Sequence, residues 1–335
     1  MGRNSQKVIR RIRIRTMTYT KICLRLHDWL LKLLGIWVYP SYWNYKTCKK
    51  IAHVKKSVIY YSARPNPGAG IGHQMANWIA GYWYARQFGL EFAHLPFSTQ
   101  KWEDFLGFGI GEKSVEELKR EGYKTRRLPL FKENNLHDLQ LQRAIIASYA
   151  GQKVVFIAEQ DQFYRDQFGV MKDIQNKFYE APSRANDHLI YNPSHFNIAI
   201  HVRRGDIMMD SSNPNLAMRY LSNEYFERVL TQVVDRVKTD KPIHIYFFSQ
   251  GKPEDYPEFA GYANLHWCMD MGAQDSFLHM VYADLLITSK SSFSYKPALL
   301  NRGIKVCPKK FWHSYPNTED WVMCDNEGNV DWKNE

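Results

Sequence analysis

Strand-like and helix-like hydrophobic patterns alternate along most of the chain. Short apolar runs rich in β-branched and aromatic residues predict buried strands at 57–61, 153–158, 198–202, 243–248, 264–268, 284–288 and 304–307. Segments in which apolar residues recur every three or four positions predict helices at 75–86, 161–178, 222–238, 275–282 and from 292 onward. This alternation predicts an α/β fold in which helices cover parallel sheets.

The alternation falls into two blocks, and a chain of 335 residues is long enough for two domains. We expect Rossmann-type domains at 56–192 and 193–335, preceded by a basic segment with an amphipathic helix at 1–55. Residues 97–142 show no sustained period apart from a helical patch at 114–120, so most of this stretch is expected to be irregular.

The N-terminal segment combines positive charge with a helical pattern. Apolar residues recur at helical spacing from about Thr20 to Val38, and Pro40 is expected to end this helix. Asp28 and Lys32 interrupt the apolar run, whereas a transmembrane helix needs ~20 apolar residues. A basic helix that carries tryptophan suits the surface of an anionic membrane, and packing against the body of the protein is the alternative.

The formal net charge of +11 calls for an anionic partner, but eight lysines and arginines precede Asp28, the first acidic residue. The rest of the chain is then only mildly basic, which argues against a body that binds nucleic acid. The five cysteines form no Cys-x-x-Cys pair, so no structural zinc is indicated. With no glycosylation acceptor, we expect a cytoplasmic protein, peripheral on the cytoplasmic membrane face; a Golgi membrane is the alternative in a eukaryote.

One predicted strand ends in a cluster of charge, Asn197-Ile-Ala-Ile-His-Val-Arg-Arg-Gly-Asp206. Open α/β sheets bind ligands beyond the carboxyl ends of their strands, and guanidinium forks pair with phosphate oxygens. Neighbouring strand residues point to opposite faces, so Arg203 and Arg204 reach one ligand only if the backbone turns, which Gly205 permits. A local salt bridge to Asp206 is the competing interpretation.

Two further stretches could contribute to an anion site. Asn66-Pro-Gly-Ala-Gly-Ile-Gly-His-Gln74 connects a predicted strand to a helix N-terminus, where free backbone N–H groups favour anions. Its glycine spacing is not that of the dinucleotide motif, and a merely tight turn would also explain it. Ser289-Lys-Ser-Ser-Phe293 follows another strand, so the ligand is expected in a cleft between the two domains.

These three stretches, in this order, resemble the motifs of the α1,2-fucosyltransferases and of their relatives, the α1,6- and protein O-fucosyltransferases. His201-Val-Arg-Arg-Gly-Asp206 is similar to the arginine signature of the family. The glycine-rich turn ending in Gln74 and the serine stretch within 283–293 are similar to two other motifs, and the resemblance covers about 57–308. His73, where asparagine is usual, and Lys290 depart from the common pattern.

The resemblance implies a GT-B-like fold of two Rossmann-type domains, with the acceptor bound by the first and the nucleotide sugar by the second. It implies an inverting, metal-independent transfer of fucose from GDP-fucose to a hydroxyl of a glycan or lipid-linked glycan, most typically in an α1,2 linkage. No cofactor is implied beyond the donor substrate, and the sequence has no Asp-x-Asp of the kind with which metal-using glycosyltransferases commonly hold the diphosphate.

By analogy with the family, Arg203 and Arg204 would neutralise the charge that grows on the leaving GDP. Asp206 is the nearest carboxylate, either as the base for the acceptor hydroxyl or as a structural partner of the arginines. Other candidate bases are Glu159, Asp161 and Asp210. The residues predicted to bind the donor are His201, Gly70, Gly72, Gln74, Asp275, Ser291 and Ser292.

Three other functions fit parts of the pattern. A transferase of the same fold could use another nucleotide sugar, and a panel of donors would separate it from a fucosyltransferase. A non-catalytic glycan- or nucleotide-binding protein would bind GDP without transfer or donor hydrolysis. A peripheral membrane adaptor would bind liposomes without nucleotide affinity, but it leaves the glycine-rich and serine-rich stretches unexplained.

Overall fold

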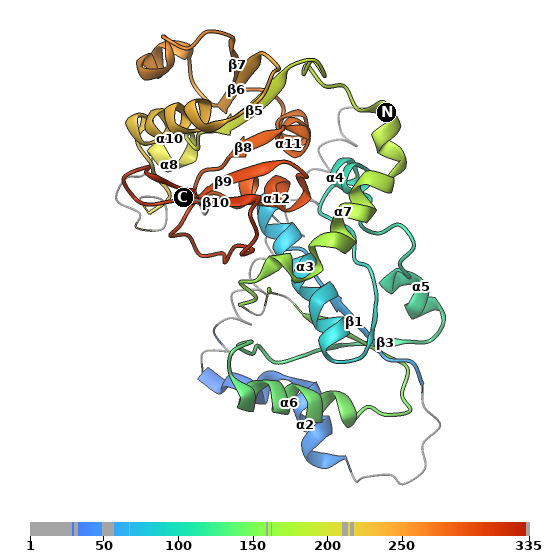
Figure 1. Cartoon of the computed structure of the whole chain (residues 1–335). Helices are drawn as coiled ribbons and strands as arrows, with labels where there is room; N and C mark the ends of the chain where they lie inside the picture. The colour runs from blue at the N-terminus through green and yellow to red at the C-terminus, as the bar shows by residue number, and fades with distance from the viewer. Residues whose placement is uncertain are drawn as a thin grey trace, which may run out of the picture.

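The computed structural model describes Trp29 and residues 33–48, 57–66, 68–158, 160–161, 163–209, 214 and 218–332. The first sheet is drawn in the lower half of Figure 1 and has four parallel strands in the order β2-β1-β4-β3. Its strands are β1 (Tyr60–Ala63), β2 (Glu91–Phe92), β3 (Lys124–Arg127) and β4 (Val154–Ala158).

The second sheet has seven strands in the order β11-β10-β9-β8-β5-β6-β7, and only the β10–β11 pair is antiparallel among them. Its strands are β5 (Phe196–His201), β6 (Ile243–Ser249), β7 (Leu265–Met269), β8 (Leu285–Ile287), β9 (Ile304–Pro308), β10 (Trp321–Cys324) and β11 (Val330–Asp331). Without the last strand, this is the 3-2-1-4-5-6 order of the Rossmann fold. The expected α/β, GT-B-like class with two Rossmann-type parallel sheets is confirmed.

Helices cover both sheets. The α-helices are α2 (Pro40–Thr47), α3 (Ile71–Gln87), α4 (Gln100–Leu106), α5 (Val115–Arg120), α6 (Leu136–Ala147), α7 (Met171–Glu180), α8 (Asp206–Met209), α10 (Asn223–Arg236), α11 (Ala273–Tyr282) and α12 (Ser292–Leu300). Short 3-10 helices lie at Gly35–Val38, Gln167–Val170, Pro182–Asn186, Pro253–Asp255 and Pro257–Phe259. Within the described residues, no helix has the length and apolar character needed to cross a membrane.

All seven predicted strands are confirmed, with ends shifted by up to a few residues, but parts of the helix prediction are wrong. The helix expected over 161–178 begins only at Met171, after a 3-10 turn that buries Gln167. The helical patch expected at 114–120 is confirmed as α5, but the rest of 97–142 contains α4, β3 and the first part of α6 rather than irregular chain. The helical segment before Pro40 ends at Val38, and Pro40 itself occupies the first position of α2, where its missing N–H does no harm.

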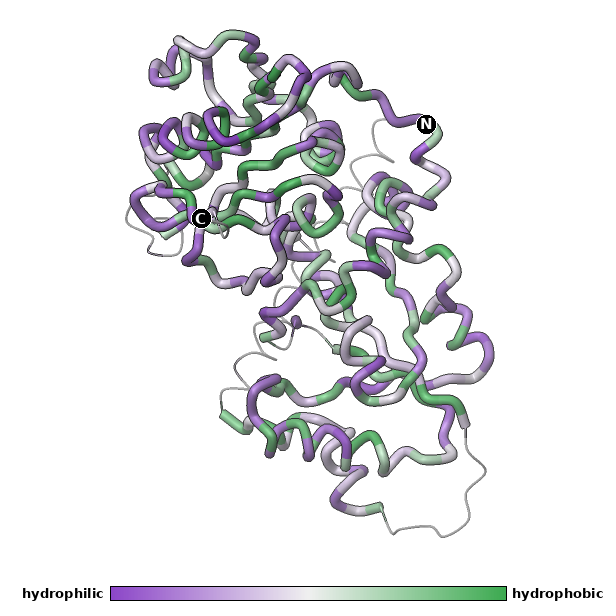
Figure 2. Tube along the Cα trace, viewed as in Figure 1, coloured by the Kyte–Doolittle hydropathy of each residue, from purple (hydrophilic) through white to green (hydrophobic). Residues whose placement is uncertain are grey.

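One continuous hydrophobic core joins the two halves of the chain. It includes Tyr61 and Trp78 near the first sheet and Phe277 and Tyr295 near the second. Figure 2 shows hydrophobic residues concentrated along the strands of the larger sheet. Helix α3 packs against α12, which fixes the first sheet relative to the second. The predicted boundaries at 55/56 and 192/193 stay a prediction, as does the helix at 20–38, most of which lies outside the described residues.

Candidate functional site

The second sheet has its topological switch point between β5 and β8. The chain runs from β5 to β6 on one side and from β8 to β9 on the other, which leaves a crevice beyond their carboxyl ends. A pocket of about 480 Å³ lies there, and we call it the switch-point pocket. It is lined by His201, Val202, Arg203, Arg204, Phe248, Ser249, Gln250, Asp270, Met271, Gly272, Ala273, Ser276 and Phe293.

His201, the last residue of β5, lies at the base of this pocket in a neutral form. Its Nδ1 lies 2.8 Å from the Ser289 hydroxyl, which follows β8, so the hydrogen bond spans the switch point. Burial first, and the charge of Arg203 second, lower the pKa of His201 to about 3. The ring therefore offers hydrogen bonds but no positive charge at ordinary pH. Ser289 was not among the predicted site residues, although its place directly after an apolar strand could have indicated it.

The turn expected after Arg204 is present. Gly205 has φ +70°, in the left-handed region that favours glycine, and a Cβ there would lie 1.9 Å from the Gln250 Oε1. Arg203 is half-buried and lines the pocket. The turn therefore brings both arginines to one pocket, as the sequence predicts.

Arg204 is held firmly from the side of α10. Its guanidinium donates to the Arg203 carbonyl oxygen and to the side-chain oxygen of Asn223, and it lies 4.9 Å from the ring centre of Tyr220 and 5.9 Å from that of Tyr256. Burial lowers the pKa of Arg204. The described partners are thus an amide, a carbonyl and two aromatic rings, which fix the guanidinium plane.

The N-terminus of α11 forms the opposite wall. Gly272 precedes its first turn, and Gly272, Ala273 and Ser276 line the pocket, so unpaired N–H groups and the helix dipole favour an anion there. Asp275 lies in the same turn but is exposed and outside the pocket lining. Asp270, which was not predicted, lines the pocket with φ +53°, a strained conformation of the kind found at binding sites.

The glycine-rich turn has a packing role. Gly70 precedes α3, and a Cβ on Gly72 would lie 2.6 Å from the carbonyl carbon and oxygen of Ser292. Glycine is therefore needed where α3 and α12 touch. Gln74 is 2% exposed and braces the turn, because its amide donates to the Ala69 carbonyl (2.8 Å) and its oxygen accepts from the Ser98 N–H (2.9 Å). Donor contacts of these three residues stay a prediction.

The serine stretch contributes less directly than expected. The Ser291 hydroxyl accepts from the Phe293 N–H at 3.2 Å and so caps α12. The Ser292 hydroxyl lies 3.5 Å from the His313 Nε2. Neither serine is among the residues that line the switch-point pocket, whereas Phe293 is. Lys290 is half-buried, and burial together with Lys310 lowers its pKa.

The described candidate bases lie at the start of α8 and in a second pocket. Asp206 begins α8, but its side chain, Glu159 and Asp210 lie outside the described residues. Asp161 lines a second pocket of about 360 Å³, which we call the Trp312 pocket, together with Glu133. Burial raises the pKa of Glu133. Sequence reasoning missed this carboxylate because it lies in the stretch that was expected to be irregular.

The Trp312 pocket borders the contact between the two halves of the chain. The Arg165 side chain donates to the Trp312 carbonyl at 2.9 Å, and the Trp312 ring lies 6.4 Å from the ring of His73 on α3. Across the described part of the chain, no group of three or more His, Cys, Asp or Glu side chains is arranged to hold a metal ion.

No family model and no curated protein sequence matches the chain. Solved structures similar in fold include the fucosyltransferase NodZ from Bradyrhizobium, with 10% identity, a TM-score of 0.42, and coverage of 83% of this chain and 98% of that one. A mutant of Arabidopsis thaliana FUT1 in complex with GDP has 13% identity, a TM-score of 0.41, and coverage of 85% and 77%. The E. coli ADP-heptose LPS heptosyltransferase II has 9% identity, a TM-score of 0.35, and coverage of 75% and 84%. Similarity of this degree does not establish a shared activity. We therefore infer the function from the chemistry of the pocket.

Proposed function

We propose that the chain is an inverting glycosyltransferase that transfers fucose from GDP-fucose to a hydroxyl group of a glycan. The observation that carries the proposal is the switch-point pocket, where two consecutive arginines, a neutral histidine and a helix N-terminus surround a space of small-molecule size. Guanidinium groups and free helix N–H groups are the donors that a diphosphate requires. The choice of GDP-fucose and of the α1,2 linkage follows from the resemblance of the three motifs.

The arginines supply the electrostatic part of the mechanism. As the bond between the sugar and the diphosphate breaks, negative charge grows on the leaving phosphate oxygen. Donors that are already in place stabilise that charge without reorganisation, and Arg204 is fixed by Asn223 and two tyrosines. Because positive charge of this kind can replace a metal ion at the leaving group, we propose that the transfer needs no metal.

His201 keeps the pocket polar without adding charge. Its hydrogen bond to Ser289 holds the ring across the switch point, and its low pKa keeps it neutral beside Arg203. A neutral ring adds no like-charge repulsion beside Arg203.

An inverting transfer also needs a base for the acceptor hydroxyl. Asp206 follows the arginine motif directly, and Glu133 offers a carboxylate whose pKa is raised by burial, as a base that works near neutral pH requires. Separate pH–rate profiles of Asp206→Asn and Glu133→Gln identify the base: its replacement removes the acidic limb of the profile, and the other variant retains that limb. Retention of the limb in both variants excludes both carboxylates.

Turnover assays with GDP-fucose, GDP-mannose and UDP-sugars test the proposal directly. We expect transfer or slow donor hydrolysis with GDP-fucose, no requirement for divalent cations, and loss of both reactions in Arg203→Ala. Selective turnover of another donor would reassign the substrate. GDP binding with neither transfer nor hydrolysis would leave a non-catalytic nucleotide-binding protein.

A further inference from the structure

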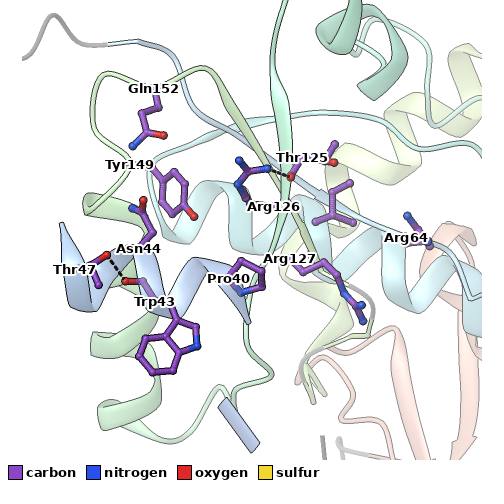
Figure 3. Close-up of a pocket in the computed structure, with 11 residues that line it drawn as sticks. Pro40, Trp43, Asn44, Thr47, Arg64, Thr125, Arg126, Arg127, Tyr149 and Gln152 are labelled. Atoms are coloured by element: carbon purple, nitrogen blue, oxygen red, sulfur yellow. Dashed lines mark hydrogen bonds between the residues drawn. The ribbon is translucent and has the colours of Figure 1, made fainter. Parts of the chain in front are cut away.

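A second arginine-lined pocket lies between α2 and the first sheet (Figure 3). We call it the α2 pocket. Its volume is about 540 Å³, within the range of small-molecule sites, roughly 300–1,000 Å³. It is lined by Pro40, Trp43, Asn44, Thr47, Arg64, Thr125, Arg126, Arg127, Tyr149, Gln152 and Ile157. Three of these described residues are arginines and none is acidic.

The sheet places these arginines where parallel sheets bind ligands. Arg64 follows β1 directly, Arg126 and Arg127 are the last two residues of β3, and β4 runs between these two strands. Side chains from the carboxyl ends of adjacent parallel strands converge at one edge. The α2 pocket therefore reaches the carboxyl ends of β1 and β3, and it extends along the edge strand β3 to Tyr149 and Gln152, which precede β4.

Two hydrogen bonds fix helix α2, which forms one wall of the pocket. The Ser41 hydroxyl donates to the Arg127 carbonyl at 2.6 Å, and the Asn44 amide donates to the Ser148 hydroxyl at 2.9 Å. Figure 3 shows the Arg126 side chain between β3 and Tyr149, with Arg64 at the far end of the pocket. The Arg126 guanidinium donates to the Thr125 carbonyl at 2.9 Å. The wall that α2 contributes is thus held in place by hydrogen bonds.

The charge distribution makes this pocket distinctive. Residues 1–56 carry 14 lysines and arginines against one aspartate, which exceeds the net charge of +11 of the whole chain. The chain from Asp28 onward is mildly basic, as expected, and the part after residue 56 is slightly acidic. Against this background, three arginines around one cavity are a local concentration of positive charge.

Apolar side chains stand beside the pocket. Trp43 lines it and is 46% exposed, and its ring lies 5.0 Å from that of Trp37, which is 51% exposed. Leu33 and Leu34 just before them are also exposed. Indole side chains next to lysines and arginines are typical of segments that rest on a membrane surface. The pocket thus offers arginines for a phosphate next to a surface for acyl or polyprenyl chains.

We propose that the α2 pocket binds the phosphate group of a lipid-linked glycan at a membrane surface. Arg64 and Arg126 would pair with the phosphate oxygens, while Trp43 and Trp37 would enter the interface of the bilayer. The role of this ligand as the acceptor substrate rests on the function proposed above. The binding site itself does not depend on it.

Vesicle binding by the full chain tests the site. The probes are phosphatidylcholine vesicles that contain polyprenyl phosphate, and vesicles of equal charge that contain phosphatidylglycerol, which measures general attraction of the basic N-terminus. We expect tighter binding to polyprenyl phosphate. Because a charge-assisted hydrogen bond is worth enough to change affinity about tenfold or more, Arg64→Gln/Arg126→Gln is expected to lose this preference.

The controls separate the pocket from bulk charge and from folding. Lys119→Gln/Arg120→Gln removes the same charge from the exposed helix α5 and should keep the preference. Arg64→Gln alone changes one exposed side chain, and its affinity for vesicles that contain polyprenyl phosphate should fall about tenfold. Equal binding to both vesicles, full retention by the double variant, or equally tight binding of soluble glucose 1-phosphate would overturn the proposal.

Thermal stabilisation by GDP keeps the two proposals apart. The arginines of the α2 pocket lie outside the switch-point pocket, so GDP should stabilise the double variant as it does the wild type. Vesicle preference without GDP binding would contradict the proposed transferase function and support the phosphate site. GDP binding without vesicle preference would support the nucleotide site and contradict the phosphate site.

Discussion

The two parallel sheets each present arginines at the carboxyl edge, but they hold them differently. In the switch-point pocket, Arg204 is 9% exposed, bound by Asn223 and enclosed by two tyrosine rings. In the α2 pocket, Arg64 is exposed and Arg126 is half-buried. A fixed charge can stabilise a transition state, whereas docking a phosphate requires only positive charge within reach. We therefore propose that the second sheet holds the catalytic site and that the first sheet docks a phosphate.

Removing an arginine of the switch-point pocket should have the largest effect. We expect Arg203→Ala and Arg204→Ala each to lower the rate of transfer by roughly 100- to 1,000-fold, the usual loss when one preorganised donor is removed. Arg126→Gln, the control in the α2 pocket, should keep kcat with a soluble acceptor. Equal losses in all three variants, measured by steady-state kinetics, would contradict the division of roles.

The turn after Arg204 should be the next most sensitive feature. Gly205→Ala puts a side chain at φ +70° and against the Gln250 amide, so we expect a loss of about 1–3 kcal/mol in the free energy of unfolding and weaker GDP binding. Gln250→Ala in the same chain removes the clash and should restore part of the loss, which denaturant unfolding of the four variants measures. Strict additivity of the two substitutions would show that the clash is absent.

Burial of neutral His201 should make stability depend on pH. The pKa of about 3 in the folded chain lies below the usual 6.5, so the unfolded chain binds the proton more readily. This contribution to stability is complete above pH 6.5 and is lost as pH falls from 6.5 towards 3, by an amount on the order of a few kcal/mol. Unfolding of His201→Gln should show a smaller loss over that window. An identical pH dependence in both proteins would show that His201 is not the cause.

The contact between α3 and α12 should give a smaller effect. Gly72→Ala forces the backbone at Ser292 to shift, and we expect a loss of about 1–2 kcal/mol in the free energy of unfolding. Gly70→Ala is the matched control, because no atom lies within 4 Å of the added Cβ, and it should change stability by less than about 0.5 kcal/mol. Equal stability of the two variants would remove the packing explanation for Gly72.

Much of the second half of the chain could be predicted from the sequence. Its strands are continuous apolar runs, and the helix expected over 222–238 is α10, which Ser222 caps. Gly205 was expected to turn the chain, and it does so with φ +70°. These signals are local, so the sequence contains them in full.

The rest depends on long-range contacts. Strand β3, Lys-Thr-Arg-Arg, has no apolar run and is a strand only because β4 pairs with it. Gln74 was predicted to meet the donor, but its partners Ala69 and Ser98 are set by how the loops fold. The Ser289–His201 hydrogen bond joins residues 88 positions apart. The α2 pocket was missed because its arginines come from separate strands.

Thermal stabilisation by GDP, compared with UDP and ADP and measured with and without EDTA, tests the central claim most directly. The pocket chemistry and the motif resemblance predict a rise in Tm that is selective for GDP, unchanged by EDTA and absent in Arg203→Ala. A rise that EDTA abolishes would contradict metal-independent binding. No rise with any nucleotide, from a protein that unfolds cooperatively, would contradict the assignment of the switch-point pocket to a nucleotide sugar.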